Sequence, residues 1–172
     1  MSFLKRLFGS GGDDLAAYRP LWHKVVELAR DPRWYREGGV ADSVGGRFDA
    51  ITLVLALVLL RMEREPELIE ATARVTELFV TDMDAQLRES GVGDIGVSKH
   101  MGKLMSAMGG RIEAYREALK QEGDEALVAA LSRNVTFNEG ADPATAAGMA
   151  RAFAGKLSAL DGQTVLAGAI AL

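Results

Sequence analysis

Apolar residues recur every three or four positions along most of this chain, and this spacing places them on one side of an α-helix. Alternation of apolar and polar residues, which would indicate strands, is rare. The pattern therefore predicts an all-α protein. Its clearest helical face lies between residues 98 and 121 and consists of Met101, Leu104, Met105, Met108, Ile112, Tyr115 and Leu119.

One predicted helix, residues 44–63, is apolar on nearly every side. Its middle is the uncharged run AITLVLALVLL, from Ala50 to Leu60. That run is about half of the roughly 20 residues that a membrane span needs, so we expect a soluble protein. A helix without a polar face belongs in the centre of a bundle.

Prolines, glycines and capping residues mark the ends of the other helices. Asp42 or Ser43 suits the N-cap of the central helix, and Gly91 suits the residue after a helix. The end of the chain, TVLAGAIAL, either closes the bundle or docks as an irregular tail. The sequence thus predicts a single-domain helical bundle over residues 14–172, with about six or seven helices around the buried central one. Besides the central helix, the expected helices are 14–30, 66–90, 98–121, 124–134 and 142–160.

Residues 1–13 are expected to form a flexible segment before the bundle. Phe3 to Phe8 has apolar side chains on one side and Lys5 and Arg6 elsewhere. This pattern suits either weak contact with an anionic membrane surface or an end that frays or packs on the body. No apolar h-region follows, so no secretory signal is predicted.

The chain of 172 residues has a net charge of −4 and no cysteine. Disulfides, zinc–thiolate sites and iron–sulfur clusters are therefore excluded, and the protein as a whole is not a basic DNA binder. The two histidines, His23 and His100, belong to no Glu-x-x-His pair, and GVGDIG follows a predicted helix rather than a strand. We therefore predict no enzyme activity, no catalytic residues, no cofactor and no metal.

The stretch MDAQLRESGVGDIGVSKHMGKLM, from Met83 to Met105, holds the most distinctive residues. Asp82 falls within the apolar stripe of the helix before it, where an unpaired carboxylate is costly. Arg47, Lys99 and Lys103 are the candidate partners. Asp82 is then either a structural ion pair that fixes the turn between two helices or a carboxylate at a partner-binding cleft.

The helix after the turn has small residues beside its methionine-rich face. Gly102, Ser106 and Gly110 are spaced by four, which allows another helix to approach closely. That neighbour is either the protein's own core helix or the helix of a bound protein. The methionines either fill the core or form a surface that adapts to varied apolar helices.

Two longer phrases carry a resemblance to a known family. RDPRWYREGGVADSVGGRFDAITLVLALVLLRM and ELFVTDMDAQLRESGVGDIGVSKHMGKLMSAMGGRIEAY resemble the two halves of the ubiquinol–cytochrome c chaperone family, over about Leu21 to Leu119. The resemblance implies a bacterial chaperone for assembly of the cytochrome bc1 complex that holds newly made cytochrome b. The resemblance also implies that the protein is cytoplasmic. Its further expected contacts are a ribosome, a small helper protein and the cytoplasmic face of the inner membrane.

The resemblance also implies a partner-binding surface, which an apolar cleft around Phe79 and Met105 would support. Two alternatives stay open: a module that tethers the ribosome or a membrane without binding the client, and an enzyme of quinone or haem metabolism. The family's signature surface maps onto Phe79, Asp82, Met83, Asp84, Asp94, Ile95, Lys99, Met101, Lys103 and Arg111.

Overall fold

The computed structural model describes residues 15–89, 91 and 93–172. In this part of the chain the regular structure is helical, with one isolated bridge between Val40 and Phe137. The predicted all-α fold is confirmed. The elements are η1 (Ala16–Tyr18), α3 (Arg19–Ala29), α4 (Pro32–Arg36), α5 (Val44–Met62), η2 (Pro66–Leu68), α6 (Ile69–Glu89), α7 (Asp94–Lys120), α8 (Glu125–Asn134), α9 (Pro143–Ala159) and α10 (Gly162–Leu166).

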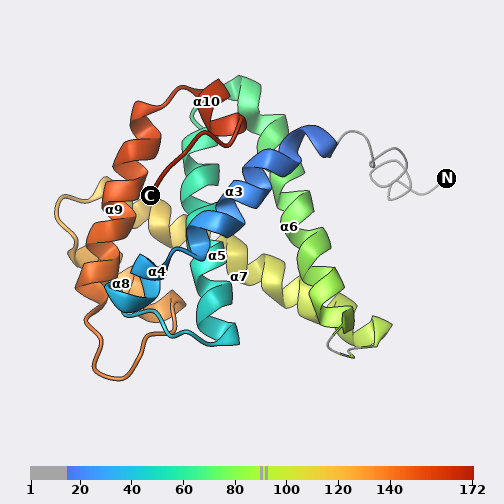
Figure 1. Ribbon diagram of the computed structural model, residues 1–172, viewed down its shortest axis with the longest axis horizontal. Helices are drawn as coiled ribbons and strands as arrows, with labels where there is room; N and C mark the ends of the chain where they lie inside the picture. The colour runs from blue at the N-terminus through green and yellow to red at the C-terminus, as the bar shows by residue number, and fades with distance from the viewer. Residues whose placement is uncertain (1–14, 90, 92) are drawn as a thin grey trace.

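Helix α5 lies at the centre of the bundle, as its sequence predicts. It packs against α3, α6, α7 and α9, and every residue from Thr52 to Leu59 is buried (Figure 1). The side chain of Ser43 caps its first turn by accepting a hydrogen bond from the Gly46 amide at 3.1 Å. A helix that is surrounded on all sides needs apolar residues on all sides, which explains its composition.

Helices α6 and α7 form a hairpin whose tip projects away from the rest of the bundle (Figure 1). Gly91 adopts a positive φ of 85° just after α6, the conformation that glycine allows at the end of a helix. Arg88 donates to Asp84 at 2.7 Å and also to Asp94, so it holds the end of α6 against the start of α7.

The predicted start of this second hairpin helix is wrong. Helix α7 begins at Asp94 rather than after Ser98, and Gly93 is its N-cap. Burial of Val97, which is 1% exposed, and the contact between Arg88 and Asp94 favour an extra helical turn. Tertiary contacts here override the weak helix propensity of the glycines.

The first and last α-helices of the described chain, α3 and α10, both pack against α5. Pro20 lies in the first turn of α3 and does not divide it. After α9 the chain forms the short helix α10, and Val165 and Ile170 pack into the core, so the end of the chain closes the bundle. The predicted segment of residues 1–13 lies outside the described residues.

Candidate functional site

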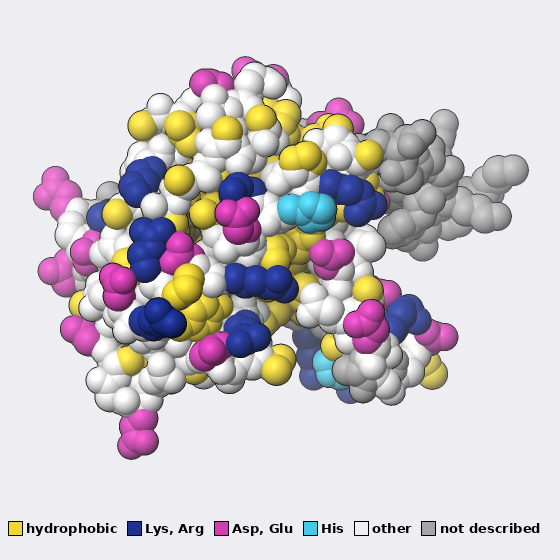
Figure 2. Space-filling view, in the orientation of Figure 1, with side chains coloured by type: hydrophobic (Ala, Val, Ile, Leu, Met, Phe, Trp, Pro, Cys, Tyr) yellow, Lys and Arg dark blue, Asp and Glu magenta, His cyan; other side chains and the backbone are white. Residues whose placement is uncertain are grey.

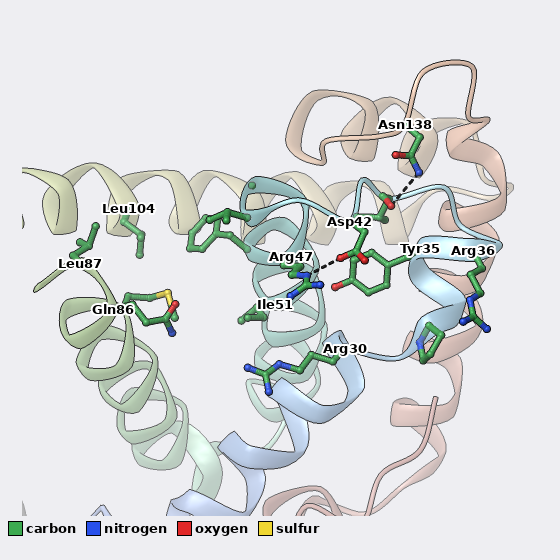
Figure 3. Close-up of a pocket in the computed structure, with 16 residues that line it drawn as sticks. Arg30, Tyr35, Arg36, Asp42, Arg47, Ile51, Gln86, Leu87, Leu104 and Asn138 are labelled. Atoms are coloured by element: carbon green, nitrogen blue, oxygen red, sulfur yellow. Dashed lines mark hydrogen bonds and ion pairs between the residues drawn. The ribbon is translucent and has the colours of Figure 1, made fainter. Parts of the chain in front are cut away.

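A groove of about 1040 Å³ opens between α5, α6, α7 and the segment around α4. Figure 2 shows this face of the molecule, where hydrophobic side chains lie in a hollow with Lys and Arg side chains around it. Figure 3 shows the lining at close range. The residues that line the groove are Arg30, Pro32, Tyr35, Arg36, Val40, Asp42, Val44, Gly45, Arg47, Phe48, Ile51, Met83, Gln86, Leu87, Leu104 and Asn138.

One end of the groove is apolar and is built by three helices. Met83 and Leu87 come from α6, Leu104 from α7, and Phe48 and Ile51 from α5. Met83 is buried at 5% exposure, whereas the other four side chains are partly exposed. This end therefore offers apolar surface to another molecule while it remains continuous with the core.

The other end of the groove carries positive charge. Arg30 follows α3, Arg36 ends α4 and Arg47 lies in the first turns of α5. Arg47 donates to Asp42 at 2.6 Å. Within the described part of the chain, the guanidinium groups of Arg30 and Arg36 form no ion pair or hydrogen bond, so both remain available to a ligand.

Tyr35 and Asn138 shape this charged end. The Tyr35 hydroxyl donates to the Ala29 carbonyl at 2.8 Å, and burial raises the pKa of Tyr35. The Asn138 amide donates to the Val40 carbonyl at 3.4 Å. Gln86, Leu87 and Leu104 lie at one end of the view in Figure 3, and Tyr35, Arg36 and Asn138 at the other, with Ile51 and Arg47 between them.

Two of the residues predicted for the site, Phe79 and Asp82, do not line the groove. Phe79 is fully buried and its ring meets that of Trp22 edge-on, with the ring centroids 5.9 Å apart. Asp82 accepts a hydrogen bond from the Trp22 indole nitrogen at 2.5 Å. The prediction that Asp82 pairs with Arg47, Lys99 or Lys103 is thus wrong. Instead, Asp82 joins α6 to α3.

Arg111 belongs to a buried polar network beneath the groove. Its guanidinium donates to Asp49 at 2.7 Å and to Thr52 at 2.5 Å, and it lies 5.5 Å from the centre of the Phe48 ring. The second oxygen of Asp49 accepts from the amide and the hydroxyl of Thr136, at 2.9 and 2.8 Å. One carboxylate thereby joins α5, α7 and the segment after α8.

Tyr115 lies one turn further along α7 and is also buried. In the described part of the chain its hydroxyl has no hydrogen-bond partner. Burial raises the pKa of the Tyr115 hydroxyl, and the nearby Arg111 charge lowers it by a smaller amount. The hydroxyl is therefore held in its neutral form.

The remaining predicted site residues lie on the hairpin. Met101 is partly buried against the core, Ile95 is 90% exposed, and Lys99 and Lys103 are exposed. Asp84 and Asp94 are held by Arg88, as described above. Of the ten predicted residues, Met83 lines the groove and the other nine do not.

The small-residue side of α7 faces away from the bundle. A Cβ added at Gly102 or Gly110 would meet no atom of the described chain within 4 Å, and Ser106 is exposed. The interpretation that this side packs on the protein's own core helix is therefore wrong. The expected cleft around Phe79 and Met105 lies instead at Met83, one turn further along α6, and at Leu104, the residue before Met105.

Sequence reasoning missed the charged end of the groove. The phrase RDPRWYREGG, with arginines on both sides of a short helix, was the available signal. In the described part of the chain, no group of three His, Cys, Asp or Glu side chains is placed to hold a metal ion. None of the helices in these described residues has the length and apolar character to cross a membrane.

Comparisons with known proteins give one family and one solved structure. A sequence model of the family described as ubiquinol-cytochrome C chaperone matches residues 36–171, including the tail beyond Gly123 in which no family phrase is recognisable. The crystal structure of the Cbp3 homolog from Brucella abortus matches with a TM-score of 0.78 and 31% identity, over 97% of this chain and 93% of that chain. Comparison with curated proteins gave no match.

Proposed function

We propose that this chain, which belongs to the ubiquinol–cytochrome c chaperone family, binds an apolar helical segment of newly made cytochrome b during assembly of the cytochrome bc1 complex. Bound in this way, the segment would be kept from aggregating. The observation that carries the proposal is the open groove between α5, α6 and α7, with its apolar end at Met83, Leu87 and Leu104.

The volume of the groove suits a short helix. An α-helix with side chains is roughly 10–12 Å across and rises about 1.5 Å per residue, so a volume of about 1040 Å³ holds roughly two turns. Helices that bind in grooves place apolar anchors from successive turns into the apolar lining. Met83 adds a flexible side chain that adjusts to anchors of different shape.

The residues of the predicted surface then divide into two groups. We propose that Met83 contacts the client in the groove and that exposed or partly exposed residues of the hairpin contact it beyond the groove: Asp84, Asp94, Ile95, Lys99 and Lys103. The other four support the walls from behind: Phe79, Asp82, Met101 and Arg111. Charged residues outside the groove would affect orientation and association rate more than affinity.

We further propose that residues 14–172 act as the chaperone domain and that residues 1–13 contact the cytoplasmic face of the inner membrane. The apolar and basic side chains between Phe3 and Phe8 support this proposal. So short a segment binds weakly alone, which suits a protein that must reach and leave its client.

Site-specific crosslinking tests the client proposal. A photo-crosslinking residue would be placed at Gln86, which lines the groove and is exposed, and at Lys103, which is exposed on α7. The matched control is Lys156, an exposed residue of α9 away from the groove lining. In bacteria that assemble a bc1 complex, we expect adducts with nascent cytochrome b at Gln86 and none at Lys156.

The other outcomes separate the competing interpretations. Additional adducts at Lys103 would indicate that the hairpin also contacts the client. Adducts with ribosomal proteins alone would favour a tether and refute the client-binding groove. Absence of adducts, together with normal bc1 assembly after deletion of the protein, would refute the proposed function.

A further inference from the structure

The groove has an uneven charge along its length, and the proposed function does not explain this. Its apolar end is formed by Met83, Leu87 and Leu104, whereas Arg30, Arg36 and Arg47 line the rest, with Asp42 as the acidic side chain of the lining. Arg47 is engaged by Asp42 at 2.6 Å, and the guanidinium groups of Arg30 and Arg36 are without partners in the described part of the chain. Two cations are thus available beside an apolar surface.

We propose that this groove selects an apolar peptide helix that carries carboxylates just beyond one end, with those carboxylates bound by Arg30 and Arg36. The inference rests on the proposed function and specifies the chemistry of the client segment. The apolar turns would lie against Met83, Leu87 and Leu104.

Charge complementarity is the physical basis for this choice. The guanidinium group carries a permanent charge and matches a carboxylate with two parallel hydrogen bonds. In Figure 3, Arg30 extends from the end of α3 toward the middle of the groove, and Arg36 lies at the end opposite Leu87 and Leu104. A basic residue of the peptide placed near Arg30 and Arg36 would be repelled by their charges, so the cationic end of the groove would reject basic segments.

The expected gain in affinity is moderate because both arginines are exposed. Exposed ion pairs are individually weak, so two of them give about a fivefold tighter complex at low salt. Salt screens such contacts, and the preference would largely disappear at about 1 M salt, where the Debye length is about 3 Å. The apolar contribution to binding would remain.

The test uses three fluorescent peptides with one apolar helical core, stapled so that all are equally helical, and with tails of two Glu, two Gln or two Lys. Fluorescence anisotropy would give their dissociation constants for the full-length protein. We expect the Glu-tailed peptide to bind about fivefold more tightly than the Gln-tailed one and the Lys-tailed one to bind more weakly than both. In the double variant Arg30→Glu/Arg36→Glu, this order should reverse.

The matched control is Arg133→Glu/Lys156→Glu, which changes the net charge equally at exposed positions outside the groove lining. It should keep the order of the unmodified protein. Equal binding of the three peptides to the unmodified protein would overturn the inference and leave the proposed function standing. Binding of no peptide, together with the crosslinking failure described above, would overturn both. Displacement of the Glu-tailed peptide by vesicles of anionic phospholipid, but not by neutral vesicles, would overturn the choice of a peptide as ligand.

Discussion

Replacing Asp49 by alanine would leave the Arg111 guanidinium buried without its carboxylate. The two side chains are 8% and 14% exposed, so water can replace little of the lost interaction. The change also removes the acceptor of two hydrogen bonds from Thr136. Removing one partner of a buried ion pair costs about 3–5 kcal/mol. That is a large part of the roughly 5–15 kcal/mol by which proteins are stable.

Urea unfolding followed by circular dichroism would measure this cost. With a slope of about 2 kcal/mol per M urea, the midpoint should fall by about 2 M. Glu63→Ala is the matched control, because it removes the Arg116–Glu63 pair, whose side chains are 33% and 42% exposed. This control should lose less than about 1 kcal/mol.

The double variant Asp49→Ala/Arg111→Leu separates the ion pair from the packing. It should be more stable than Asp49→Ala alone, because no unpaired charge remains buried. Asp49→Asn serves as a milder change if the alanine variant does not fold, since its carbonyl can still accept from Thr136. A loss below about 1 kcal/mol for Asp49→Ala would refute the structural role of this network.

Three further changes test other parts of the structure. Tyr115→Phe should raise stability by about 1 kcal/mol, since it removes a buried hydroxyl that has no partner among the described residues. Burial raises the pKa of Tyr115, so as the pH rises the hydroxyl loses its proton in the unfolded chain before it does in the folded protein. The unmodified protein should therefore lose stability above about pH 10 faster than the variant does, as measured by urea titrations. Equal pH profiles of the two proteins would contradict this. Gly46→Ala should cost about 2 kcal/mol or more in thermal unfolding, because its Cβ would overlap the Ala41 carbonyl. Trp22→Phe should cost about 1–2 kcal/mol by removing the indole donor to Asp82, and an unchanged urea midpoint would show that this bond contributes nothing.

Local features of the fold were predictable because they depend on neighbouring residues. The central helix follows from an apolar run with no polar face. Ser43 marks the start of a helix because its side chain accepts a backbone hydrogen bond, and Gly91 marks the end of one because glycine allows a positive φ. The start of α7 was missed because Arg88 and the buried Val97 supply contacts that glycine propensities do not reflect.

The candidate site was only partly predictable. Met83 was predicted as a site residue from the family resemblance, and it lines the groove. The partners of two charged residues were not predictable: Asp82 bonds to Trp22, 60 positions away, and Arg111 to Asp49, 62 positions away. Such pairs form where packing brings two elements together, and no local pattern records them.

The sequence by itself determined that this chain forms a helical bundle around one buried helix, because helical periodicity and apolar burial are properties of short segments. It also indicated the chaperone family through the order of several phrases. Only the tertiary structure decided where the bundle stays open. A groove with an apolar end at Met83 and a cationic end at Arg30 and Arg36 requires α5, α6, α7 and the α4 segment to be placed together, and their relative placement depends on contacts between residues far apart in the chain.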